Sequence, residues 1–128
     1  MLLSGAVLPA CSDDGPSVAP PTTGDGSPVA TFQVVDETYK IALATPELVD
    51  HAKRLLAGEP IAAIPLGTVV RDSPGPNAPW SWHIDPATLE FADMTIEVCD
   101  GLPSYVEDEI VTSDQYCPWS AKVIAIEY

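Results

Sequence analysis

The chain has 128 residues, with five lysines and arginines against nineteen aspartates and glutamates. At this length one globular domain is the upper limit. The formal net charge of −14 opposes binding to nucleic acid, whose phosphates it would repel, and to anionic lipid surfaces. The sequence contains no run of about 18 apolar residues, so it predicts no membrane-spanning helix.

The first eleven residues, MLLSGAVLPAC, resemble the lipobox of bacterial lipoproteins. Leu8 and Ala10 stand three and one positions before Cys11, as that motif requires. Pro9 is an unusual occupant of the middle position, and the basic segment that opens a secretory signal is missing. We expect residues 1–11 to be a lipoprotein-type signal segment that ends at an acylated cysteine, with the true start upstream. The alternative is a chance cysteine in a frayed N-terminus.

Residues 12–29 are expected to form a disordered tether. Up to Pro28 they hold no aromatic residue and one apolar residue larger than alanine, so they bury too little surface to offset their chain entropy. Mixed proline, glycine and serine give a semi-extended segment. Such a segment after an acylated cysteine would hold a domain, here residues 30–128, away from a membrane.

Three cysteines, Cys11, Cys99 and Cys117, make an odd count for an exported chain. Lipidation of the first leaves the other two as a pair for a disulfide, worth about 3 kcal/mol in the chain-entropy model. A zinc site is the alternative. It is weakly supported, because no CxxC spacing exists and the two histidines lie in unrelated contexts.

One helix is predicted after Thr45, a good N-cap, with Pro46 in the first turn and Gly58 just beyond the end. Its apolar residues form a single stripe: Leu48, Val49, Ala52, Leu55 and Leu56. His51 lies off this stripe, and we expect it to be solvated.

The other periodic segments indicate strands. They cover residues 31–43, 61–71, 80–84, 94–99 and 121–126, and the alternation in 94–99 predicts a half-buried strand. In the first, the apolar parity changes near Asp36 and Glu37, which predicts a bulge or a bend. Pro65 confines the second to an edge or to the strand's start. The order predicts an α+β fold, with a single helix packed on an antiparallel sheet of about four to five strands and one disulfide.

The most unusual composition lies in residues 77–85, NAPWSWHID, where two tryptophans, a histidine and an aspartate fall within six residues. On a strand, Trp80 and Trp82 share one face, and Ser81 and His83 share the other. The simpler interpretation is that the tryptophans supply core area, and that His83 is satisfied by a backbone group. The functional alternative is a ligand-binding surface made of Asn77, Trp80, Trp82, His83 and Asp85.

A second cluster is acidic. Carboxylates are calcium ligands and can act as general acids or bases, but no EF-hand spacing is present, and a solvated acidic face is the simpler interpretation. The cluster comprises Glu90, Asp93, Glu97, Asp100, Glu107, Asp108 and Glu109.

Three strings resemble one known domain family: NAPWSWHIDP at 77–86, FADMTIEVCDGLPSYVE at 91–107 and YCPWSAKV at 116–123. The family is common in bacterial secreted proteins and lipoproteins and is similar to the N-terminal domain of a slime-mould calmodulin-binding protein. The resemblance covers about residues 31–127 and implies a small extracytoplasmic domain with Cys99 and Cys117 bridged. It brings no catalytic residues. Calmodulin binding should not transfer, because calmodulin targets are basic amphipathic helices and this chain is acidic.

The sequence therefore predicts a recognition or interaction domain of the bacterial cell envelope, anchored outside the cytoplasm by lipid, with no catalytic residue, metal or cofactor. The expected partner is a protein or small molecule, not nucleic acid, and the lipid anchor is the expected membrane contact. Three alternatives remain: a protease inhibitor presenting the loop 73–79 with Arg71, a small hydrolase using His83 with Asp85 or Glu97, and a calcium-binding domain.

Overall fold

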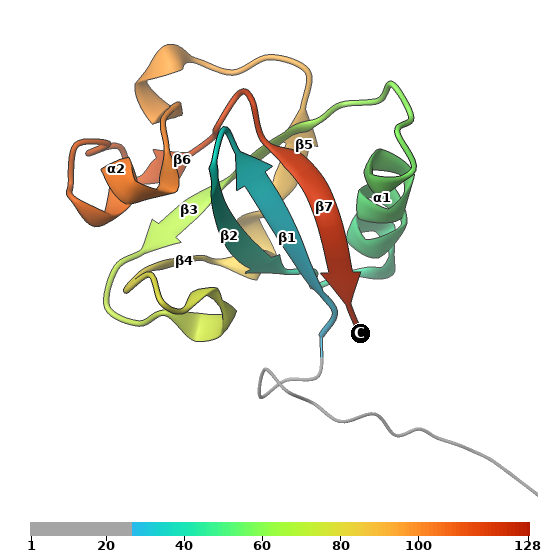
Figure 1. Cartoon of the computed structure of the whole chain (residues 1–128), viewed down its shortest axis with the longest axis horizontal. Coiled ribbons are helices and arrows are strands. Elements are labelled where there is room, and N and C mark those ends of the chain that lie inside the picture. Colours follow the sequence, from blue (N-terminus) through green and yellow to red (C-terminus); the bar gives the residue numbers. More distant parts are fainter. Residues whose placement is uncertain (1–26) are drawn as a thin grey trace, which may run out of the picture.

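The computed structural model describes residues 27–128, which fold into two antiparallel sheets and two helices (Figure 1). No helix in this part of the chain is long and apolar enough to cross a membrane. The strands are β1 (Val29–Val34), β2 (Glu37–Ala42), β3 (Ile64–Val70), β4 (His83–Ile84), β5 (Glu90–Ala92), β6 (Gln115–Tyr116) and β7 (Lys122–Glu127). The helices are α1 (Pro46–Leu56) and α2 (Pro103–Glu107), with short 3-10 helices η2 (Gly75–Asn77), η3 (Pro86–Thr88) and η4 (Glu97–Cys99).

The first sheet has the order β2-β1-β7. Val34 at the end of β1 faces Glu37 at the start of β2, and the two residues between them form a tight turn with Val35 at φ 60°. The change of apolar parity in the sequence therefore marks a hairpin turn and not a bulge within one strand. The bulge lies elsewhere, between Thr31 and Phe32, where the register of β1 against β7 shifts.

The second sheet is built around β3, which pairs with three short strands. β5 pairs with residues 64–66, β6 with 67–68 and β4 with 69–70, all antiparallel. Gly67 lies where a Cβ atom would collide with the Ile84 side chain of β4, so the close approach of these two strands requires glycine there.

Five aromatic side chains join the two sheets in one core. Tyr39 of β2 is the centre of the group. Its ring centroid lies 5.4 Å from that of Phe32, 5.8 Å from that of Trp82 and 5.3 Å from that of Tyr116. Phe91 of β5 completes the group with a centroid 6.2 Å from that of Phe32. Aromatic pairs at such spacings add to the burial of apolar area.

The helix α1 confirms the prediction from the sequence. The Thr45 hydroxyl accepts a hydrogen bond from the Leu48 N–H, and Gly58 beyond the end has φ +87°. The helix buries Ala52 and packs against β7, beside which it lies in Figure 1. The expectation of a solvated His51 is wrong, because its ring stacks on Phe91 at 4.4 Å and its Nε2 lies 2.6 Å from the carbonyl oxygen of Ala62.

The predicted fold class is wrong. The chain does not pack one helix on a single sheet; it is mainly β, with a sheet of three strands and a sheet of four. Three of the strands have only two or three residues, too few to produce a periodic pattern. The segment 94–99, expected to be a half-buried strand, is instead a loop followed by η4. Its apolar side chains face solvent, with exposed fractions of 83% for Met94, 68% for Ile96 and 58% for Val98.

The predicted signal segment with Cys11, and nearly all of the predicted tether, lie outside the described residues. The tether was expected to reach residue 29, whereas β1 begins at Val29.

Candidate functional site

Two residues of the expected ligand-binding surface belong to the interior. Asn77 and Trp82 are each 1% exposed. The Asn77 side chain links two parts of the backbone: its Oδ1 accepts from the Lys40 N–H at 2.7 Å, and its Nδ2 donates to the Trp82 carbonyl at 2.9 Å. Both residues hold β2 against the segment before β4. Neither side chain is accessible to a ligand at the surface.

The other three expected ligand-binding residues also make contacts within the domain. Half-buried Trp80 donates its indole N–H to the Thr38 carbonyl at 2.8 Å. The Nδ1 of His83 lies 2.8 Å from the Ser73 carbonyl oxygen, and Asp85 caps η3 by accepting from the Ala87 N–H at 3.0 Å. The structure thus brings this segment together as a scaffold that joins the two sheets.

Arg71, expected in the inhibitor alternative, and Glu107 of the acidic cluster also make contacts within the domain. The Arg71 guanidinium donates to the carbonyls of Val106 and Val111, both at 2.9 Å, so it ties α2 and the following loop to β3. Glu107 accepts from the N–H and the hydroxyl of Ser81 at 2.9 and 2.8 Å. These two bonds lower the pKa of the Glu107 carboxyl. Among the described residues, the His83 side chain makes its hydrogen-bond contacts with Ser73, and none with Asp85 or Glu97.

The acidic cluster does not converge. Residues 27–128 contain no group of three histidine, cysteine, aspartate or glutamate side chains arranged to hold a metal ion. Glu107 binds Ser81, and Asp100 accepts from the Trp119 N–H at 2.8 Å. The calcium alternative therefore has no ligand set in this part of the chain.

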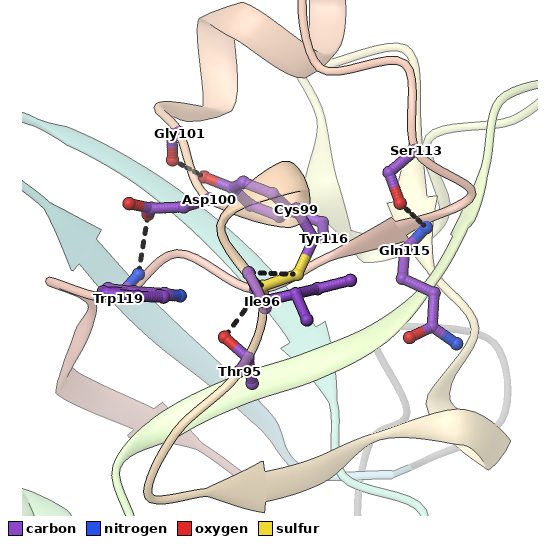
Figure 2. Close-up of a disulfide and its surroundings, with 10 residues drawn as sticks. Thr95, Ile96, Cys99, Asp100, Gly101, Ser113, Gln115, Tyr116 and Trp119 are labelled. Atoms are coloured by element: carbon purple, nitrogen blue, oxygen red, sulfur yellow. Dashed lines mark hydrogen bonds between the residues drawn. A yellow bond between two sulfur atoms is a disulfide. The ribbon is translucent and has the colours of Figure 1, made fainter.

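The disulfide between Cys99 and Cys117 is confirmed, with the two Cα atoms 5.1 Å apart (Figure 2). The backbone reinforces it, since the Cys117 N–H donates to the Cys99 carbonyl at 2.7 Å. The Thr95 hydroxyl donates to the sulfur of Cys117 at 3.1 Å. Together these contacts fasten the loop after β5 to the end of β6.

A cavity of about 450 Å³ lies beside this disulfide. The loop after β5 supplies most of its lining, β3 supplies one apolar residue, and the segment around β6 supplies a hydroxyl and an amide. The lining residues are Leu66, Met94, Thr95, Ile96, Cys99, Ser113 and Gln115. Figure 2 shows Ile96 on one side of this region, and Ser113 and Gln115 on the other. Apolar walls with a few polar groups are typical of ligand pockets.

The cavity was missed by the sequence analysis because Met94 and Ile96 look like the buried face of a strand. The signal in the sequence that could have indicated the cavity is the negative charge around Met94 and Ile96. Residues 72–121 contain ten aspartates and glutamates and no lysine or arginine. Asp93 and Glu97 flank the loop lining and Asp114 lies between the other two lining residues, all three of them exposed.

Comparison with curated proteins and with solved structures finds no match for the chain. A family model does match, the BP-74 N-terminal domain, over residues 28–128. This range contains the two sheets, the disulfide and the cavity, and it includes the three strings on which the resemblance to the slime-mould domain was based. The chain belongs to the BP-74 N-terminal domain family.

Proposed function

We propose that this chain is an extracytoplasmic recognition domain, held at the membrane by an acylated Cys11, that takes an apolar group of its partner into the cavity beside Cys99 and Cys117. The observation that carries the proposal is the cavity itself, about 450 Å³ in volume and bordered by Met94 and Ile96. Apolar side chains gathered around a hollow are typical of binding sites on soluble domains.

The disulfide supports a location outside the cytoplasm. Disulfides persist in oxidising compartments and are rare where thiols are kept reduced. Here the Cys99–Cys117 bond fastens the loop that lines the cavity, so the site would be formed where the bond is stable.

The position of the cavity loop suits an anchored domain. In Figure 1, β1 begins at the lower end of the view, whereas the connection from β5 to α2 crosses its upper end. That connection carries Met94, Thr95, Ile96 and Cys99 of the lining. If the domain is joined to its tether at β1, the opposite end, which carries the connection from β5 to α2, would be directed away from the membrane and open to a partner.

Small apolar solutes test the recognition site. Indole, p-cresol and isobutanol resemble free side chains, and each is titrated into the ¹⁵N-labelled, oxidised chain while amide chemical shifts are followed. We expect shifts confined to the lining residues, with dissociation constants on the order of 1–10 mM for such small ligands. Ile96→Ser should weaken them. Ile124→Ser, which removes the same side chain from β7 where it is 42% exposed, should not. Absence of shifts at the lining would refute the site.

The anchor is tested separately in a bacterial host. Mass spectrometry of the membrane fraction should find the chain acylated at Cys11, and Cys11→Ser should move it to the soluble fraction. Recovery of unmodified chain in the cytosol, with Cys99 and Cys117 reduced, would refute the proposed location.

A further inference from the structure

The loop that lines the cavity presents free backbone groups. Within residues 27–128, the N–H groups of Met94, Thr95 and Ile96 have no hydrogen-bond acceptor in the protein. The backbone at Ile96 is extended, with φ −78° and ψ 157°. An extended segment with unpaired backbone groups is a template on which another strand can add.

The loop places two apolar side chains between two carboxylates. Met94 and Ile96 are apolar and strongly exposed, with fractions of 83% and 68%. Asp93, at a bend, and Glu97, at the start of η4, are exposed carboxylates on either side of this pair. A strand laid against the loop would therefore meet apolar groups between two negative charges.

The negative charge around the loop favours a positively charged partner. All five basic residues of the chain lie outside residues 72–121, where ten acidic residues are found. Three of the five are paired within the domain: Lys40 with Glu127, Arg54 with Glu59, and Arg71 with two carbonyls. An approaching cation meets no basic residue in the loop or in the lining. It would be drawn to the cavity at low ionic strength.

The same charge disfavours the two occupants that this chain could supply. A second copy carries the same net charge of −14 and would bring its own Asp93 and Glu97 to the contact. Residues 1–26 contain three aspartates and no lysine or arginine. Like charges placed directly opposite each other destabilise strand pairing.

We propose that the partner is an extended peptide segment with alternating basic and apolar side chains, which pairs its backbone with Met94–Ile96 and inserts one apolar side chain into the cavity. This inference rests on the proposed recognition function and specifies the class of its ligand. Backbone hydrogen bonds would fix the register of the peptide against Met94–Ile96. The cavity would select its apolar side chain, and the carboxylates of Asp93, Glu97 and Asp114 would select its basic side chains.

The test uses blocked heptapeptides and the full oxidised chain. The peptide KTKLKTK alternates lysine with neutral residues and places one leucine at the centre, whereas ETELETE has the same pattern with the opposite charge. We expect KTKLKTK to bind at least about tenfold more tightly than ETELETE at low salt, with the difference reduced at 0.5 M salt. Calorimetry measures the affinities, and amide shifts locate the contact at residues 93–97.

Two further comparisons separate strand pairing from a purely ionic contact. KTKLKTK is N-methylated at leucine or, in another peptide, at the preceding lysine. Successive N–H groups of a strand point to opposite edges, so only one of these two peptides should lose affinity, by about tenfold. On the protein, Asp93→Asn with Glu97→Gln should weaken KTKLKTK about fivefold or more. Asp50→Asn with Asp72→Asn, which makes the same charge change elsewhere on the surface, should have less than a twofold effect.

The outcomes distinguish the two proposals. If the small solutes bind the cavity but KTKLKTK and ETELETE bind equally, the inference about the partner is wrong and the recognition site remains. If the solutes also fail to bind, both are wrong. A peptide of residues 12–26 that binds as tightly as KTKLKTK, or a dimer in sedimentation that is lost in the Asp93→Asn and Glu97→Gln variant, would assign the loop to this chain itself and overturn the inference.

Discussion

Tyr39 and Tyr116 pack with their ring centroids 5.3 Å apart, yet only Tyr116 has a partner for its hydroxyl. The Tyr116 hydroxyl donates to the Gly101 carbonyl at 2.7 Å. The Tyr39 hydroxyl is buried and, among the described residues, has no hydrogen-bond partner. Burial raises the pKa of both hydroxyls. The same residue type thus carries opposite consequences for stability at two neighbouring positions of one core.

Replacing each tyrosine by phenylalanine should separate these consequences. Tyr39→Phe removes a buried group that has lost its water without a replacement, so it should raise the free energy of unfolding by about 1 kcal/mol. Tyr116→Phe leaves the Gly101 carbonyl without its donor and should lower it by about 1 kcal/mol. Urea unfolding at pH 7 measures both. Equal losses in the two variants would mean that Tyr39 has a partner in solution.

Glu107 should make the domain sensitive to acid. Its pKa is lowered by the two hydrogen bonds from Ser81, so the ionised carboxylate favours the folded state. The stabilisation is fully present above the pKa of the unfolded chain and is lost as the pH falls through the lower pKa of the folded state. Glu107→Gln should therefore lower the free energy of unfolding at pH 7 and lose less stability between pH 6 and pH 3.

The control for this prediction is Glu90→Gln, which removes an exposed carboxylate of β5 with no side-chain hydrogen bond among the described residues. Urea unfolding across this pH range is compared for the two variants and the unaltered chain. If the free energy of unfolding of Glu107→Gln falls between pH 6 and pH 3 as much as that of the unaltered chain, the Ser81 contact contributes nothing to stability.

Local signals in the sequence were sufficient for α1 because its boundaries are set within the helix itself. Thr45, Pro46 and Gly58 act through backbone geometry and capping, which depend on near neighbours. The two-sheet arrangement depends instead on pairings between distant residues, such as Gly67 with Tyr116 and Ile64 with Ala92. A two-residue strand is too short for a periodic pattern that would indicate its partner. The division into two sheets therefore could not be predicted from the sequence.

The candidate site was missed for a related reason. Met94, Ile96 and Val98 alternate with polar residues as a half-buried strand does, and the pattern alone does not show whether another element covers the apolar side. The disulfide was correctly predicted because counting cysteines does not require a fold. What the sequence could not show is that the bridged Cys99 belongs to the wall of a cavity.

Asn77 should be essential for folding. Its buried amide bonds the backbones of Lys40 and Trp82, and truncation would leave a buried N–H and a buried carbonyl without partners. We expect Asn77→Ala to lower the free energy of unfolding by about 2–4 kcal/mol. Thermal and urea unfolding measure the loss. A folded, fully stable Asn77→Ala variant would show that the two hydrogen bonds of this side chain contribute nothing to stability.

The disulfide should stabilise both the domain and its cavity. Cys99 and Cys117 are 18 positions apart, and a bridge that closes a loop of this size contributes about 3 kcal/mol by restricting the unfolded chain. Replacing both cysteines by alanine should therefore lower the free energy of unfolding by about 3 kcal/mol.

The same double variant should weaken the binding of indole to the cavity, because Met94–Cys99 is then held only by backbone and packing contacts. Thr95→Val is the matched control for stability alone, since it removes the hydrogen bond to the Cys117 sulfur and leaves the bridge intact, whereas Thr95 itself lines the cavity. It should cost about 1 kcal/mol or less. Unfolding is measured on all variants, and indole titration on the double variant and the unaltered chain. If the double variant is destabilised but binds indole as tightly as the unaltered chain, the bridge stabilises the fold and does not shape the cavity.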